Sequence, residues 1–146
     1  MFDANLILLD GSIDLTAALD TPAISTTIDS ATGAKVLDIG ETGVNGLVAV
    51  LICVDDVVAD ADTLTAYLQA SDTIDMTAAT DIERLGSFGV ANATTGVILG
   101  SETPCVAMVK FATKKRYVRL NATVGASPDD FLTVKCYLEP FSFKTL

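Results

Sequence analysis

The feature that most constrains the fold is a regular alternation of apolar and polar residues. In Thr63–Ser71 every second residue is apolar, from Leu64 to Ala70, and the residues between them are mostly polar. The segments Arg116–Val124 and Phe131–Glu139 alternate in a similar way. A period of two is typical of a β-strand with one buried face. The three segments therefore predict strands of a sheet that covers a hydrophobic core.

Further segments have weaker strand patterns. The segment Leu47–Val54 is apolar at every position, which indicates a central strand covered on both faces, for instance by a second subunit. Residues typical of turns, mainly Gly, Asn, Asp, Ser and Thr, lie between the segments. About eight short strands predict an all-β fold, a jelly-roll-like antiparallel β-sandwich. The other predicted strands are Ile24–Ile28, Lys35–Ile39, Ile82–Val90 and Pro104–Phe111.

The length predicts one domain. The chain has 146 residues, half of them hydrophobic, which suffices for one sizeable core. We therefore expect a single sandwich over residues 1–146, with short terminal arms at about 1–5 and 140–146. The start of the chain has no basic residues before its apolar run, and a membrane span needs about 20 apolar residues. We expect no signal peptide, no membrane association and synthesis in the cytoplasm.

Composition excludes several classes of function. The chain contains no histidine, so no Ser-His-Asp triad, Cys-His pair or histidine metal site can form. The net charge of −10 argues against nucleic acid and anionic membranes as partners, since both attract basic surfaces. We expect a protein that is not an enzyme and has no cofactor and no small-molecule substrate.

Two groups of potential metal ligands have plainer interpretations. The thiols of Cys53, Cys105 and Cys136 have no C-x-x-C spacing and lie among apolar neighbours, which predicts reduced, buried side chains. Four aspartates cluster in Asp55–Asp62, and calcium prefers such oxygen ligands. The spacing fits no EF-hand, so a solvated acidic loop is the favoured interpretation and a cation site the alternative.

Charge is distributed unevenly along the sequence. Residues 1–83 contain 15 acids and one base, a net charge of −14, whereas residues 84–146 contain eight bases and four acids, a net charge of +4. We favour strands from both halves that interleave and mix these charges, over a polarity that steers association. One basic cluster stands out, and it predicts either a site for an acidic protein partner or a solvated turn. Its members are Lys114, Lys115, Arg116 and Arg119.

Aromatic residues provide two more candidate contacts. Met1 and Phe2 open the chain, and Phe141 and Phe143 follow the last predicted strand. Such termini predict docking onto a neighbouring molecule, with closure of the chain's own core as the alternative. Three tyrosines lie at the outward positions of predicted strands, where they would line a sugar-binding groove or pack against another subunit. They are Tyr67, Tyr117 and Tyr137.

The segment Thr113–Val124 resembles the penultimate strand of a family of tailed-bacteriophage capsid cement (decoration) proteins. Three other features are similar and occur in the same order: Leu15-Thr16-Ala17, Ile24–Ile28 followed by Leu37–Gly40, and Leu64–Asp72. Together they cover most of the chain. The Arg-Tyr-Val-Arg-Leu motif within Thr113–Val124 also recurs in discoidin-type carbohydrate-binding sandwiches.

The resemblance implies a jelly roll that sits on the outer face of an icosahedral phage head. Such a protein, as a dimer or trimer, would stabilise the virion by bridging neighbouring subunits of the major capsid protein. The alternative is a carbohydrate-binding β-sandwich module of a phage host-recognition apparatus. The residues expected to contact the capsid or another copy are Met1, Phe2, Lys114, Lys115, Arg116, Arg119, Phe141 and Phe143.

Overall fold

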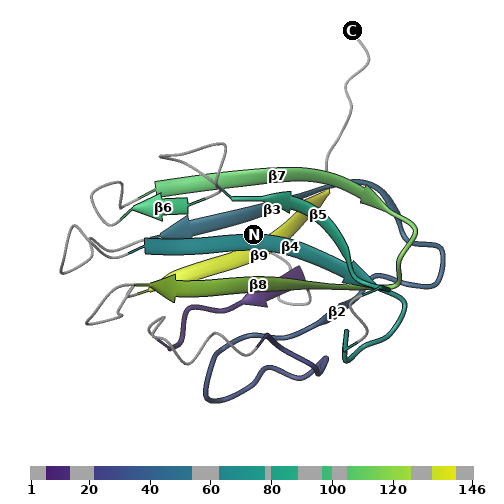
Figure 1. Cartoon of the computed structure of the whole chain (residues 1–146), viewed down its shortest axis with the longest axis horizontal. Helices are drawn as coiled ribbons and strands as arrows, with labels where there is room; N and C mark the ends of the chain where they lie inside the picture. Colours follow the sequence, from purple (N-terminus) through teal and green to yellow (C-terminus); the bar gives the residue numbers. More distant parts are fainter. Residues whose placement is uncertain are drawn as a thin grey trace, which may run out of the picture.

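A computed structural model describes residues 6–13, 22–53, 63–77, 80–88, 97–99, 105–125 and 133–140. Nine strands are found among these residues, and they form two sheets packed against each other (Figure 1). No helix in this part of the chain is long and apolar enough to cross a membrane. The strands are β1 (Ile7–Leu9), β2 (Leu37–Asp38), β3 (Val44–Cys53), β4 (Thr63–Ser71), β5 (Glu83–Ser87), β6 (Val97–Leu99), β7 (Cys105–Thr113), β8 (Tyr117–Gly125) and β9 (Val134–Pro140).

The strand order is that of a jelly roll. One sheet has the order β1-β9-β3-β7 and the other the order β2-β8-β4-β5, and every pair is antiparallel. Both β5 and β6 pair with β4, β6 opposite its first residues and β5 further along. These two short strands thus share one position in the sheet, and β6 was not among the predicted strands. The all-β jelly-roll sandwich is confirmed.

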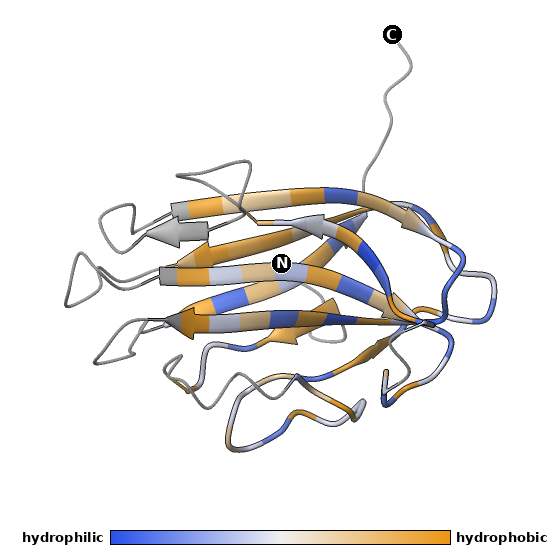
Figure 2. Cartoon of the chain, viewed as in Figure 1, coloured by the Kyte–Doolittle hydropathy of each residue, from blue (hydrophilic) through white to orange (hydrophobic). Residues whose placement is uncertain are grey.

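The hydrophobic core lies between the two sheets and follows the predicted alternation. The inward side chains of β4, from Leu64 to Ala70, are fully buried, and those of β8, from Val118 to Val124, are at most 4% exposed. Figure 2 shows the alternation of apolar and polar residues along both strands. Strand β3 lies between β9 and β7, as its apolar sequence predicted. Its inward residues join those of β9 in the same core.

Two short segments besides β6 differ from the prediction. Ile24–Ile28 forms bends instead of a strand, because the Ser25 hydroxyl accepts a hydrogen bond from the Thr27 amide and closes a local turn. The run that includes Ile7–Leu9, interpreted only as a short apolar stretch, forms β1 and pairs with β9. Local polar contacts and a distant strand partner decide these two cases, and neither is visible in a short window of sequence.

The turn that leads into β3 lies close to the corner between β7 and β8. Gly43 has a φ of +64°, and a Cβ atom at this position would lie 2.1 Å from the Thr113 carbonyl oxygen and 2.6 Å from the Lys114 Cα atom. Only glycine combines this backbone conformation with so close an approach. The turn therefore brings the start of β3 beside the basic residues predicted as a binding site.

Candidate binding surfaces

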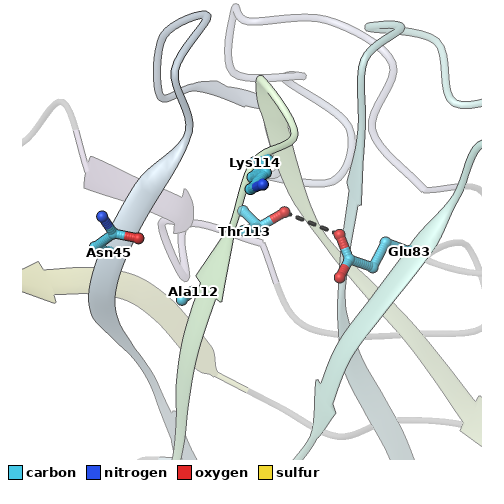
Figure 3. A pocket seen from close by; sticks show the side chains of 5 residues that line it. All are labelled: Asn45, Glu83, Ala112, Thr113 and Lys114. Carbon is cyan, nitrogen blue, oxygen red and sulfur yellow. Dashed lines mark hydrogen bonds between the residues drawn. The ribbon is translucent and has the colours of Figure 1, made fainter.

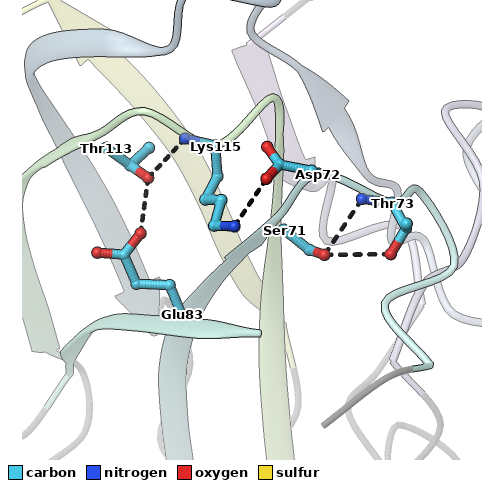
Figure 4. Close-up of polar contacts among 6 residues, drawn as sticks. All are labelled: Ser71, Asp72, Thr73, Glu83, Thr113 and Lys115. Carbon is cyan, nitrogen blue, oxygen red and sulfur yellow. Dashed lines mark hydrogen bonds and ion pairs between the residues drawn. The ribbon is translucent and has the colours of Figure 1, made fainter. Parts of the chain in front are cut away.

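The β7–β8 corner presents the basic cluster, but two of its cations are paired within the chain. The Lys115 ammonium lies 2.7 Å from the Asp72 carboxylate (Figure 4). The Arg116 guanidinium donates hydrogen bonds of 2.8 to 3.1 Å to both carboxylate oxygens of Asp38, and it lies 3.6 Å from Glu41. The corner is therefore close to neutral, because acids from the first half of the chain meet bases from the second.

Local turns hold both carboxylates in place. The Ser71 hydroxyl accepts a hydrogen bond from the Thr73 amide at 3.2 Å, which turns the chain after β4 and directs Asp72 toward Lys115 (Figure 4). The Asp38 carboxylate also accepts a hydrogen bond from the Gly40 amide at 3.0 Å. These contacts hold each acid beside its cation, so the ion pairs are part of the corner's structure.

The ion pairs shift the pKa values of all four groups. The hydrogen bond from Arg116 is the main cause that lowers the pKa of Asp38, and the hydrogen bond from Lys115 is the main cause for Asp72. The same contacts raise the pKa of Lys115 and of Arg116. Each pair is thus charged at neutral pH. An acidic partner at this corner would have to compete with carboxylates that are already bound.

Lys114 is the exposed member of the cluster. It lines a small pocket of about 330 Å³ together with Asn45, Glu83, Ala112 and Thr113 (Figure 3). The Thr113 hydroxyl donates a hydrogen bond of 3.0 Å to the Glu83 carboxylate. Thr113 and Glu83, which line the pocket, are therefore hydrogen-bonded to each other. No ion pair of Lys114 is found within the described residues, and its ammonium is the group at this corner best placed for a partner.

Arg119 has a different environment from the rest of the cluster. It points away from the core, as its strand position predicted, but it is only 6% exposed because two loops cover it. Its guanidinium donates hydrogen bonds to the Gln69 side chain at 2.9 Å, the Ala23 carbonyl at 3.2 Å and the Asp75 carbonyl at 3.5 Å. Burial lowers the pKa of this guanidinium. Arg119 therefore holds the two loops against β4 and β8 and does not present its charge to solvent.

The three tyrosines do not line one groove. Tyr67 and Tyr117 lie on strands of one sheet, and Tyr137 lies on the other sheet. The Arg84 guanidinium stacks 4.3 Å from the centre of the Tyr67 ring, and the Arg116 guanidinium lies 5.0 Å from that of Tyr117. Rings that are covered in this way and divided between two faces do not form a platform for one sugar.

Some of the remaining candidates from the sequence lie outside the described residues. They are Met1, Phe2, Phe141, Phe143 and the loop Asp55–Asp62. Cys53 and Cys136 are buried, and burial raises the pKa of the Cys136 thiol, so this thiol is unreactive at neutral pH. Among the described residues, no group of three or more acids and cysteines could hold a metal ion.

The apolar sequence of Leu47–Val54 predicted that both faces of this strand are covered. The structure shows in addition that an apolar face continues across the outer side of the whole sheet β1-β9-β3-β7. Its edge strand β7 exposes Val106 and Met108, whose exposed fractions are 58% and 67%. The available signal was the alternation within β7, where Ala107, Val109 and Phe111 point to the core. Val106 and Met108 at the other positions mark a second apolar face, and large exposed apolar side chains are typical of a contact with another molecule.

Comparison of the chain with protein-family models, with curated proteins and with solved structures finds no match. The function is therefore argued from the residues and the fold.

Proposed function

We propose that the protein is a capsid cement (decoration) protein of a tailed bacteriophage. It binds the outer surface of an icosahedral head and stabilises it by bridging neighbouring subunits of the major capsid protein. The observation that carries the proposal is the strand order β1-β9-β3-β7 over β2-β8-β4-β5. The sequence resemblance implies a jelly roll, and this order is the one a jelly roll has. Fold and resemblance thus support the same class of protein.

The surfaces of the sandwich suit a protein that binds other proteins. It combines an exposed apolar sheet face with an accessible Lys114, and such contacts need no cofactor, nucleic acid, membrane or small-molecule substrate. Each contact can be weak, because one cement molecule holds several shell subunits and many copies act together. In this proposal the terminal residues Met1, Phe2, Phe141 and Phe143 and the ammonium of Lys114 contact the shell.

Co-sedimentation with expanded, empty phage shells tests this function. The protein should pellet with the shells, reach a saturating number of copies and raise the temperature at which they rupture. Protein that stays in the supernatant at saturating concentrations would refute the cement function. A glycan array run in parallel separates the alternative, because a sugar-binding module would bind the array and ignore the shells.

Single charge reversals test the contribution of Lys114. The Lys114→Glu variant should bind shells several-fold more weakly, since charges at the edge of an interface mainly affect association. Lys35→Glu makes the same change of charge near β2 and should bind like the wild type. Arg116→Glu is unsuitable for this purpose, because it would place a third carboxylate beside Asp38 and Glu41. Equal binding by the Lys114 and Lys35 variants would show that Lys114 does not contribute to shell binding.

A further inference from the structure

The outer face of the sheet β1-β9-β3-β7 has an apolar layer separate from the core. Val48 and Val50 of β3 are only 7% and 5% exposed, yet they do not belong to the core cluster between the sheets. They point to the opposite side, where Val106 and Met108 of β7 are largely exposed. A solvated sheet face normally alternates to polar residues at these positions. The exposed apolar area of this layer is therefore at Val106 and Met108, which the described residues of the monomer do not cover.

Strand pairing aligns these outward side chains in rows. Met108 lies opposite Val50, Val50 opposite Tyr137, and Tyr137 opposite Ile7. Side chains that lie directly opposite each other on one face are in contact. An apolar row therefore crosses all four strands of the sheet. In Figure 1 the four strands lie side by side in the sheet that contains β7 and β9.

Charges flank the apolar row on both sides. In the neighbouring row on the side of Thr113, at the end of β7, Lys110 and Glu139 lie on either side of Val48. In the neighbouring row on the other side, nearer Cys105 at the start of β7, Lys135 and Val106 lie on either side of Ile52. This face therefore has two cations and one carboxylate, whereas the whole chain has a net charge of −10. Repulsion between two copies of so acidic a protein is reduced where faces without an excess of acids meet.

We propose that this face binds a second copy of the chain, about a two-fold axis that lies in the interface and runs parallel to β3. A two-fold interface joins one patch to itself, so the patch must be self-complementary. About this axis, Lys110 lies opposite Glu139 of the partner subunit, and the same ion pair occurs a second time by symmetry. Met108 lies opposite the partner subunit's Tyr137, a favourable contact between sulfur and an aromatic ring.

A second copy explains the pattern better than an unrelated partner. The face presents a cation and a carboxylate at mirrored positions about β3, and the same face turned over supplies the complementary charge at each of them. Two sheet faces also pack well onto each other, at a spacing of about 10 Å with nearly aligned strands. A second copy thus supplies partners for Met108, Lys110, Tyr137 and Glu139, while Lys135 faces Val106 of the partner subunit at the edge of the contact.

The area of the face determines how tightly the two copies should bind. The three rows contain ten outward positions, and each covers roughly 33 Å² at the usual spacings of a sheet. The face thus offers about 330 Å², less than half of the roughly 800 Å² per partner in a standard stable complex. The dimer should be weak and reversible, so it must be sought at micromolar to millimolar concentrations.

Sedimentation equilibrium of the full chain tests the dimer. At about 0.15 M salt, where charges are screened beyond about 8 Å, the mass should rise with concentration from 15.2 kDa toward twice that value. The Met108→Lys variant should remain a monomer. Thr123→Lys introduces the same charge on the outer face of the other sheet and should dimerise like the wild type. A wild type that stays monomeric, or a Met108→Lys variant that still dimerises, would overturn the proposal.

Mixing two charge-reversal variants tests the axis. Lys110→Glu and Glu139→Lys should each dimerise about tenfold more weakly, because each places like charges opposite each other twice. An equimolar mixture should form a heterodimer near wild-type affinity, since both ion pairs return across the interface. Ion pairs within one chain cannot produce this recovery. No recovery in two variants that unfold like the wild type would refute the axis along β3.

The dimer does not depend on the proposed function. A monomer that pellets with shells would overturn the dimer alone, and a dimer that ignores shells would overturn the cement function alone.

Discussion

Arg119 offers the sharpest test of how the fold is held together. Arg119→Met removes the guanidinium and keeps most of the buried stem. Three hydrogen bonds from a charged donor contribute about 1.5–3 kcal/mol each. Removing the group also relieves the cost of burying a cation, which is several kcal/mol. The expected net loss in the free energy of unfolding is about 2 kcal/mol, or a melting temperature lower by roughly 4–10 °C.

Urea denaturation measures this loss, and hydrogen exchange locates it. Exchange should accelerate most at the amides of 22–36 and 72–77, because the guanidinium joins these loops to the sheet. Arg84→Met is the matched control. The Arg84 guanidinium stacks on Tyr67 of the same sheet but is exposed, so its removal should lower the free energy of unfolding by no more than about 0.5 kcal/mol. Equal losses in the free energy of unfolding for the two variants would refute this reasoning. They would mean that the hydrogen bonds of Arg119 only compensate for the hydration that its guanidinium loses on burial.

Other positions give further predictions. Leu68→Ala, in a fully buried position, should lower the free energy of unfolding by about 2–5 kcal/mol in urea titrations, and a loss below 1 kcal/mol would contradict its place in the core. Gly43→Ala should destabilise more than Gly40→Ala, because both glycines have positive φ but a Cβ at Gly40 meets nothing within 4 Å. The pKa values of Asp38 and Asp72 are lowered in the folded state, so stability from their ion pairs is fully present above the ordinary carboxyl pKa and lost as pH falls below about 4. Asn at both positions should flatten this acid side of the stability profile, and an unchanged profile would refute the assignment.

Much of the fold follows from local sequence. The predicted strand Thr63–Ser71 has the bounds of β4, because its alternation is regular and both ends are polar. The predicted Arg116–Val124 differs from β8 by one residue at each end. Short strands are different, since β1 has only three residues and is defined by its pairing with β9. No local pattern can reveal a strand whose partner lies at the other end of the chain.

The surroundings of the candidate binding residues were harder to predict than the strands. The sequence marks Lys115 and Arg116 as a cluster, but their partners Asp72 and Asp38 lie 43 and 78 residues away. Only the folded chain shows that these cations are already paired. The predicted mixing of acids from the first half with bases from the second is what these two ion pairs provide. The outer face of Leu47–Val54 was expected to be covered, but its continuation over β7 and β9 was not predicted, because the rows of this face run across strands and sequence order lists residues along them.

The position of β9 has a consequence for synthesis of the chain. The last strand inserts between β1 and β3, so β1 has no other strand partner in the described part of its sheet. Until Val134–Pro140 leaves the ribosome, one edge of the apolar strand β3 is unpaired, and β1 is held only by its backbone contacts with residues 33–35. The sheet β1-β9-β3-β7 can close only after this strand is made, and contacts between distant segments make such folding slow. A nascent chain in this state is prone to aggregation, and it is the arrival of one seven-residue strand that ends the exposure.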